Sequence, residues 1–232
     1  MITLYSAGSP NVFKVSIALE ELGLEYEKRV VNLRRGEQFT PEFLAISLNN
    51  RVPAIVDHAP ADGGEPLAMF ESGAILLYLA EKTGRLMPTD IRGRSVVQNW
   101  VMWQMAGQGP MLGQCGHFRN YAPEKIPYGI DRYTNEGKRL YDVLDRRLEG
   151  RSYVAGDDYT IADVACWPWI LFRSHHGIAL EDYPNLERWY HTVADRPAVV
   201  RALDGFVVPP PPEFDEQARK SLFGVSEVKA PA

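Results

Sequence analysis

The chain contains few of the residues that build redox or metal sites. Its 232 residues include two cysteines, Cys115 and Cys166, and five histidines. The cysteines do not form a Cys-x-x-Cys pair, and no two histidines have His-x-x-x-His or His-Glu-x-x-His spacing. Two thiols are too few for a disulfide framework. The sequence therefore predicts no metal site and two reduced thiols that are buried and structural.

Long hydrophobic runs and an excess of basic charge are also lacking. Uncharged apolar runs, such as residues 73–80 and 165–172, do not exceed nine residues, whereas a membrane-spanning helix needs about 20. The 25 basic and 30 acidic residues give a net charge of -5, which provides no basic footprint for nucleic acid. Residues 1–5 carry no basic region of the kind that opens a signal peptide. We therefore expect a cytoplasmic protein that binds neither membranes nor nucleic acid.

Residues 2–83 alternate between strand and helix patterns. Predicted strands at residues 2–6 and 26–31 enclose a helix that begins after Ser9 and ends at Gly23. A strand, a helix and a strand of this length form a βαβ unit, in which the two strands run parallel. The apolar positions of the helix recur three or four residues apart, at Val12, Val15, Leu19 and Leu22.

A second pair of strands is predicted further along the chain. Residues 54–57 and 67–70 have strand composition, and the Asp-Gly-Gly turn signal between them favours an antiparallel hairpin. A short helix is expected after Pro41, and a longer apolar helix over residues 73–83. The order of elements is therefore βαβ-α-ββα, around a mixed four-stranded sheet.

The rest of the chain shows helical patterns and no convincing strand. Thr160 and Asp163 have the spacing of a capping box at the start of a buried helix that runs through Phe172. Pro209–Pro212 favours polyproline II, and the residues beyond it are expected to be ordered only if Phe214 or Phe223 packs into a groove. The other predicted helices span residues 91 to about 117, 128–148, 186–195 and 198–203. The predicted organisation is an α/β domain over 1–83, a linker over 84–89, an all-helical domain over 90–207 and a Pro-rich C-terminal tail over 208–232.

Three short motifs carry a resemblance to a known family. Val52-Pro53 precedes the third strand, where thioredoxin-like folds have a cis-proline, and Glu71-Ser72 opens the helix that follows the hairpin. Thr160-x-x-Asp163 opens a later helix. With the order of elements, these motifs resemble the cytosolic glutathione transferase superfamily from Met1 to about Leu203. The resemblance implies a thioredoxin-like N-terminal domain that binds glutathione, followed by an all-α C-terminal domain.

Longer stretches resemble one subgroup of that superfamily. This is the bacterial nu-class, which is similar to the fungal nitrogen-regulatory prion protein and whose members are described as glutathione-dependent disulfide-bond oxidoreductases. The stretches that carry the resemblance are residues 41–44, 47–50, 52–57, 61–66, 70–79 and 103–111.

The resemblance implies a glutathione site with four contributors. The hydroxyl of Ser72 and the backbone N–H groups beside it hold the γ-glutamyl carboxylate, and Glu71 accepts from the ammonium group. Val52, next to a cis Pro53, pairs through its backbone with the cysteinyl unit. Gln38 bonds the glycyl end. Without the resemblance, other interpretations stay open: Ser72 can be a simple helix N-cap, and Gln38 can be a solvated loop residue.

The position of the thioredoxin Cys-x-x-Cys pair is occupied here by residues without a thiol. The chain has Ser9-Pro10-Asn11-Val12 at this point, so the attacking sulfur must come from glutathione. Ser9 and Asn11 are the candidate catalytic residues, because a hydroxyl, an amide and a helix N-terminus each stabilise a thiolate. Both side chains can also cap the helix, and the two roles are compatible. Tyr5, within the first strand, is an alternative donor.

The subgroup resemblance also implies a homodimer. Arg132 matches the helix position that contacts a glutathione carboxylate near the dimer interface, although by itself it reads equally as an exposed helix arginine. Three functions stay open: a glutathione-dependent disulfide-bond oxidoreductase, a glutathione transferase for small electrophiles, and a non-catalytic glutathione-binding regulator. Glutathione is a co-substrate in the first two, and no metal is expected.

Overall fold

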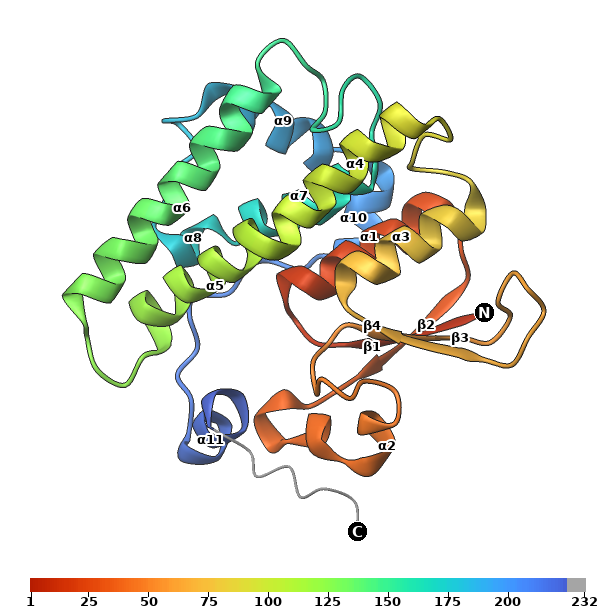
Figure 1. Cartoon of the computed structure of the whole chain (residues 1–232). Coiled ribbons are helices and arrows are strands. Elements are labelled where there is room, and N and C mark those ends of the chain that lie inside the picture. Colours follow the sequence, from red (N-terminus) through yellow and green to blue (C-terminus); the bar gives the residue numbers. More distant parts are fainter. Residues whose placement is uncertain (225–232) are drawn as a thin grey trace.

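The computed structural model describes residues 1–224, and a four-stranded sheet forms the base of their N-terminal part (Figure 1). β1 pairs parallel with β2 and antiparallel with β3, and β3 pairs antiparallel with β4. The predicted parallel pair, hairpin and mixed sheet are thus confirmed. The strands are β1 (Ile2–Ser6), β2 (Tyr26–Val30), β3 (Ala54–Asp57) and β4 (Leu67–Phe70), in the spatial order β2-β1-β3-β4.

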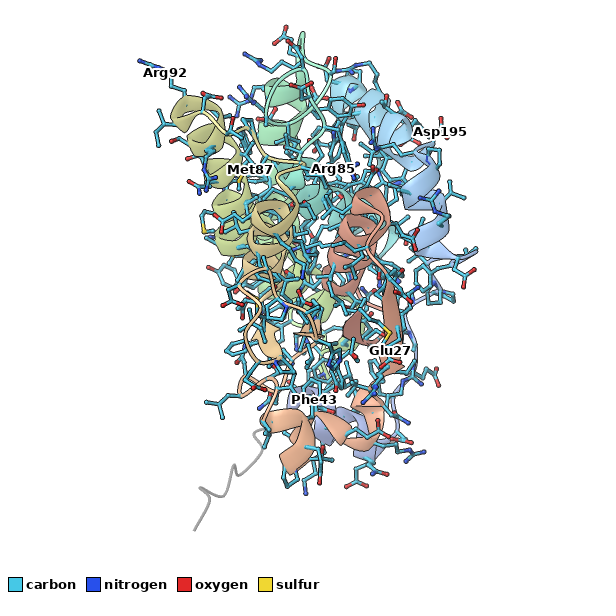
Figure 2. All side chains as sticks on the ribbon, turned by 90° about the vertical axis from the view of Figure 1, so that its right-hand side faces the viewer. Glu27, Phe43, Arg85, Met87, Arg92 and Asp195 are labelled. Atoms are coloured by element: carbon cyan, nitrogen blue, oxygen red, sulfur yellow. The ribbon has the colours of Figure 1, made fainter. Side chains whose placement is uncertain are left out.

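Alternate side chains of β1 enter two apolar layers, as the two-residue period of a strand requires. Ile2 and Leu4 join the main core beneath α1 (Pro10–Leu22) and α3 (Ser72–Thr83), which cover one face of the sheet (Figure 1). On the opposite face Tyr5 packs edge-on against Phe43 of α2 (Pro41–Leu44). Figure 2 shows Phe43 at one end of the molecule and Arg92 at the other.

The helical part departs from the prediction between residues 91 and 121. Instead of one continuous helix to about residue 117, two π-helical turns alternate with α-helix. Pro110 explains the first turn, because its ring would clash with the carbonyl of residue 106 in a regular α-helix, and a wider turn relieves the clash. The segments are α4 (Ile91–Trp103), η3 (Gln104–Gln108), α5 (Gly109–Gly116) and η4 (His117–Tyr121).

α7 (Ile161–Leu171) packs chiefly against α1, α4 and α3, and its side chains are almost all buried. Its capping box is present as predicted: Thr160 N donates to Asp163 Oδ2 at 3.0 Å, and Thr160 Oγ1 accepts from the first turn, with Ala162 N at 3.2 Å. No helix between residues 1 and 224 is long and apolar enough to span a membrane. The remaining helices are α6 (Pro127–Leu148), α7 (Ile161–Leu171), α8 (Arg173–His176), α9 (Pro184–Ala194) and α10 (Pro197–Leu203).

The C-terminal segment folds back onto the N-terminal part. α11 (Glu216–Phe223) lies beside the turn η1 (Leu33–Arg35), which is followed by η2 (Glu37–Phe39) (Figure 1). Phe214 and Phe223 both pack on Tyr121, with ring centroids 5.4 and 5.9 Å apart. The sequence predicted order beyond Pro212 only if Phe214 or Phe223 packed into a groove, and both phenylalanines do pack against the rest of the protein. Residues 225–232 of the predicted tail lie outside the described residues.

Candidate active site

Three chain segments meet at one edge of the sheet. The strand register places Tyr5, near the end of β1, opposite Ala54 at the start of β3, and Ala54 opposite Phe70 at the end of β4. The start of α1, the loop before β3 and the start of α3 are therefore neighbours. That loop contains a cis peptide bond between Val52 and Pro53, as the resemblance implied.

A hollow of about 340 Å³ opens at this edge, and we call it the cis-proline hollow. It brings together four of the seven predicted site residues: Asn11, Val52, Glu71 and Ser72. The other residues in its wall are Asn49, Arg51, Pro53, Phe70 and Met105.

The start of α3 forms one side of this hollow and carries hydrogen-bond donors. Ser72 is the first helical residue and is 3% exposed, while Glu71 holds the capping position with a φ of 70° and no side chain caps the helix. The first N–H groups of α3 are therefore free of a side-chain acceptor, and the helix dipole adds positive potential there. The Glu71 carboxylate accepts from Asn49 Nδ2 at 3.3 Å. The site thus offers donors for a carboxylate next to an acceptor for an ammonium group.

The amide of Asn11 has its orientation set by Trp169. The indole Nε1–H of Trp169 donates to Asn11 Oδ1 at 3.1 Å. Because an indole N–H can only donate, the amide oxygen must face Trp169, and the amide NH₂ is left for another acceptor. Asn11 lines the cis-proline hollow, so this NH₂ group is available to a sulfur or oxygen atom bound there.

Ser9, the N-cap of α1, is not part of the wall of the cis-proline hollow. Its Oγ accepts from Val12 N at 3.4 Å as the N-cap of α1, which leaves its own hydroxyl proton free to donate. Ser9 lines a second cavity of about 630 Å³, which we call the apolar hollow. Its other walls include Trp169 and Phe172 of the α7 segment and Phe214 and Phe223 of the C-terminal segment. Capping and facing a ligand are therefore compatible for Ser9, as proposed from the sequence.

Both cysteines are buried and unreactive. Cys115 and Cys166 are free thiols with no exposed surface. Burial raises the pKa of each thiol above its ordinary value, and thiols in apolar surroundings are poor nucleophiles. The chain's own sulfur atoms are therefore not suited to disulfide exchange.

The structure places Gln38 and Arg132 apart from the cis-proline hollow. Gln38 is 4% exposed, and its amide donates to the backbone oxygens of Leu33 and Ser221. Arg132 lies on α6 with its side chain 54% exposed and pairs with Glu136 at 3.9 Å.

Sequence reasoning missed several residues of the site. Arg51 lines the cis-proline hollow. It directly precedes the Val52-Pro53 motif in the sequence, and this position could have indicated its place in the site. Lys14 interrupts the apolar pattern of α1 and is nevertheless 1% exposed, which marks it as a buried charge with a specific environment. Trp169 gave no local signal, because its partner Asn11 lies 158 residues earlier.

Comparisons with known families agree with this architecture. Residues 1–81 match the family model "Glutathione S-transferase, N-terminal domain", and residues 131–197 match "Glutathione S-transferase, C-terminal domain". The chain belongs to the glutathione S-transferase family.

Individual relatives indicate which members of the family this chain is similar to. The disulfide-bond oxidoreductase YfcG of Escherichia coli is 52% identical over 203 residues, which cover 88% of this chain and 94% of YfcG. The protein URE2 of Candida glabrata is 35% identical over 88% of this chain and 67% of its own length. A crystal structure of a glutathione transferase from Burkholderia graminis, with two glutathione molecules bound per subunit, is 47% identical. It superimposes with a TM-score of 0.84 and covers 88% of both chains. The predicted subgroup resemblance is thereby confirmed.

Proposed function

We propose that this protein is a glutathione-dependent disulfide-bond oxidoreductase whose attacking thiolate belongs to bound glutathione. The observation that carries the proposal is the oriented amide of Asn11, which faces a hollow with the features of a glutathione site. The buried state of both cysteines supports a mechanism that uses no protein thiol. The identity with YfcG, named a disulfide-bond oxidoreductase, supports the reaction type.

Glutathione would use the hollow in three places. Its γ-glutamyl carboxylate would accept from Ser72 and the first N–H groups of α3, and its ammonium group would donate to Glu71. Its cysteinyl unit would pair with the backbone of Val52 in the manner of an added strand. Its sulfur would then accept from the Asn11 amide and the Ser9 hydroxyl. Lowering a thiol pKa from 8.5 by one to two units stabilises the thiolate by roughly 1.4–2.7 kcal/mol.

The reaction would take place in two exchange steps. The glutathione thiolate attacks one sulfur of the substrate disulfide, forming a mixed disulfide and releasing the other sulfur as a thiolate, which takes up a proton. The thiolate of a second glutathione attacks the glutathione sulfur of the mixed disulfide, giving glutathione disulfide and the second substrate thiol. The two electrons that reduce the substrate come from two glutathione molecules. The Burkholderia graminis structure, which has two glutathione molecules bound per subunit, supports the proposal that a site of this kind can hold both molecules.

The apolar hollow supports conjugation as a second candidate function. Its volume of about 630 Å³ and its aromatic walls would suit a small apolar electrophile beside the same thiolate. A regulator that binds glutathione without turnover is the third alternative, and the likeness to URE2 keeps it among the functions to be tested.

One pair of assays distinguishes these functions. Turnover of hydroxyethyl disulfide with glutathione is measured beside turnover of a chloronitrobenzene electrophile. Activity with the disulfide and little with the electrophile is the expected result. Activity with the electrophile alone would replace the proposal by a transferase, and saturable glutathione binding without either activity would replace it by a regulator. Cys115→Ser and Cys166→Ser are expected to keep the disulfide activity.

We further propose a homodimer in which Arg132 contacts a glutathione carboxylate near the interface. The exposed position of Arg132 on α6 is compatible with such a contact. Gln38 stays a candidate for the glycyl end, and this role would require its amide to exchange the Ser221 contact for the ligand. A cytoplasmic location is proposed because the reaction consumes reduced glutathione and both cysteines are unpaired.

A further inference from the structure

The structure assigns to Lys14 the role of a positioning residue. We propose that its buried ammonium group acts through the Ser72 hydroxyl to hold the γ-glutamyl carboxylate, and that Lys14 takes up a proton when glutathione binds. The inference rests on the proposed glutathione site and adds a proton linkage to it.

Lys14 projects from α1 into the space beneath the start of α3. Its Nζ donates to Ser72 Oγ at 3.2 Å, to Gln104 Oε1, and to Met105 Sδ at 3.5 Å. These three acceptors use all three ammonium protons, and none of them is charged. Lys14 is only 1% exposed. Its direct contacts thus carry no negative charge, and Glu71, in the wall of the same hollow, is the nearby carboxylate. A bound anion would add to that charge.

The surroundings of Lys14 are continuous with the proposed ligand site. Lys14 lines a hollow of about 340 Å³, which we call the lysine hollow. It shares Asn11, Glu71 and Met105 with the cis-proline hollow. Gln104 also lines the lysine hollow, and its Nε2 is buried without a hydrogen-bond partner. The polar groups beneath Ser72 are thus only partly satisfied by the protein itself.

The protonation of Lys14 is balanced near neutral pH. Burial lowers the pKa of its amine to about 7, against the opposing influence of Cys166 on α7 and of Glu71 before α3. Because burial raises the pKa of Cys166, this thiol is neutral near pH 7, and Glu71 is the charged group that favours the protonated amine there. η3 contributes Gln104 and Met105, which do not titrate. A carboxylate bound at Ser72 would add negative charge close to the amine and favour its protonated form.

The protonation state also decides which way the Ser72 hydroxyl can donate. A charged ammonium group can only donate, so Ser72 Oγ accepts from it. The serine hydroxyl itself donates to Met105 Sδ at 3.5 Å, and a bound carboxylate, which is a stronger acceptor than a thioether, would take that proton in its place. A neutral amine has a lone pair and can accept that proton instead. The charged form therefore orients a chain of donors from Lys14 through Ser72 to the ligand, and successive bonds in such a chain strengthen one another.

Proton uptake can be measured with a ligand that has no thiol. S-methylglutathione keeps both carboxylates and the ammonium group, so its binding releases no thiol proton. We would titrate the protein calorimetrically in two buffers with different ionisation enthalpies, at pH 7.5 and at pH 6. With a pKa near 7, about 0.4 to 0.8 proton per site should be taken up at pH 7.5 and much less at pH 6.

Two variants complete the experiment. Lys14→Met keeps the length of the side chain, and it should abolish the uptake at pH 7.5 and weaken binding roughly tenfold through loss of a charge-assisted contact. Lys138→Met, on the exposed surface of α6, is the matched control and should behave like the wild type. Circular dichroism checks that each variant is folded.

The outcomes distinguish this inference from the proposed function. Binding of S-methylglutathione to the wild type without proton uptake, or with equal uptake at both pH values, would overturn the role of Lys14 and leave the glutathione site intact. Equal uptake by a folded Lys14→Met variant would overturn it as well. Absence of any binding would remove the glutathione site and this inference together. If Lys14→Met does not fold, the two wild-type titrations decide.

Discussion

At the scale of single residues, the proposed mechanism depends on the amide of Asn11, whose orientation is set by a hydrogen bond from Trp169. The Asn11 amide oxygen accepts from Trp169 Nε1–H, and Asn11 lines the cis-proline hollow, so its NH₂ group is left to donate to a ligand there. A thiolate in that hollow would accept a charge-assisted hydrogen bond, which is worth about 1.5–3 kcal/mol. In the proposed mechanism Trp169 would act indirectly, by orienting the Asn11 amide.

Asn11→Ala is expected to raise the pKa of bound glutathione by about one unit and to lower kcat roughly tenfold. Trp169→Phe, which keeps an aromatic ring but loses the N–H, should produce a smaller shift in the same direction because the amide is no longer held. The pKa is measured by titrating the ultraviolet absorbance of the bound thiolate. An unchanged titration in Asn11→Ala would exclude the amide as a donor to sulfur.

The lowered pKa of Lys14 also predicts how the free energy of unfolding depends on pH. Its pKa is lowered from 10.5 to about 7 on folding, so between these pH values the unfolded chain binds a proton that the native chain does not. The free energy of unfolding of the wild type therefore rises with pH across this window. Below pH 7, where Lys14 is protonated in both states, burying its charge lowers the free energy of unfolding by about 5 kcal/mol. Above pH 10.5 this destabilisation is absent.

Lys14→Met removes that contribution. The stability of Lys14→Met relative to the wild type should be highest at pH 6.5 and should fall as the pH rises to 9.5. Urea unfolding of both proteins at several pH values measures this difference, and other titrating groups cancel in the comparison. A difference that does not change with pH would contradict a buried amine of lowered pKa.

At the scale of elements, Asp163 joins α7 to its neighbours. Its carboxylate is fully buried and accepts from Val154 N at 2.8 Å, Thr160 N at 3.0 Å and Trp189 Nε1 at 2.8 Å. One side chain thus caps α7, holds the preceding loop and anchors α9. Removing a shared acceptor leaves three buried donors without a partner.

Asp163→Ala should therefore lower the free energy of unfolding by about 3–5 kcal/mol. Asp142→Ala is the matched control, because Asp142 forms an exposed pair with Arg146 on α6. Its loss should cost less than about 1 kcal/mol. Urea unfolding measures both values, and a similar small cost for both variants would contradict the anchoring role of Asp163.

The C-terminal segment forms one wall of the apolar hollow. Phe214 and Phe223 line it and pack on Tyr121. Replacing both phenylalanines by alanine should raise KM for an apolar disulfide about 5- to 30-fold, which corresponds to roughly 1–2 kcal/mol of lost apolar contact. KM for glutathione should change little. Val207→Ala, at an 81% exposed position, is the control, and equal KM values for all three proteins would show that the segment takes no part in binding.

At the scale of the whole molecule, the proposed homodimer has an apolar surface to bury. Several large apolar side chains on α4 and β4 are exposed, namely Ile91, Met102, Leu67 and Phe70. Met102→Asp should weaken the dimer at least tenfold, because a charge would be buried at the interface. Val200→Asp on α10 is the control. Sedimentation measures both, and an unchanged dimer in Met102→Asp would place the interface elsewhere.

Much of the architecture was predictable because its signals are local. The bounds of β3, β4 and the capping box of α7 follow from patterns within ten residues, since strand alternation and capping act over short distances. The π-helical turns before and after α5 were not predicted, although Pro110 gave a local reason for one of them. The predicted domain boundaries after residues 83, 89 and 207 stay predictions.

The amino-acid sequence alone predicted the mixed sheet and the helical C-terminal part, because strand and helix patterns are local. The resemblance of its motifs to a known family implied the grouping of Asn11, Val52, Glu71 and Ser72. Only the tertiary structure decided the partners of those groups. Trp169 reaches Asn11 across 158 residues, Gln104 reaches Lys14 across 90, and Ser221 reaches Gln38 across 183. Patterns of polarity determine which side chains are buried, whereas the packing of distant helices determines which buried donor meets which acceptor.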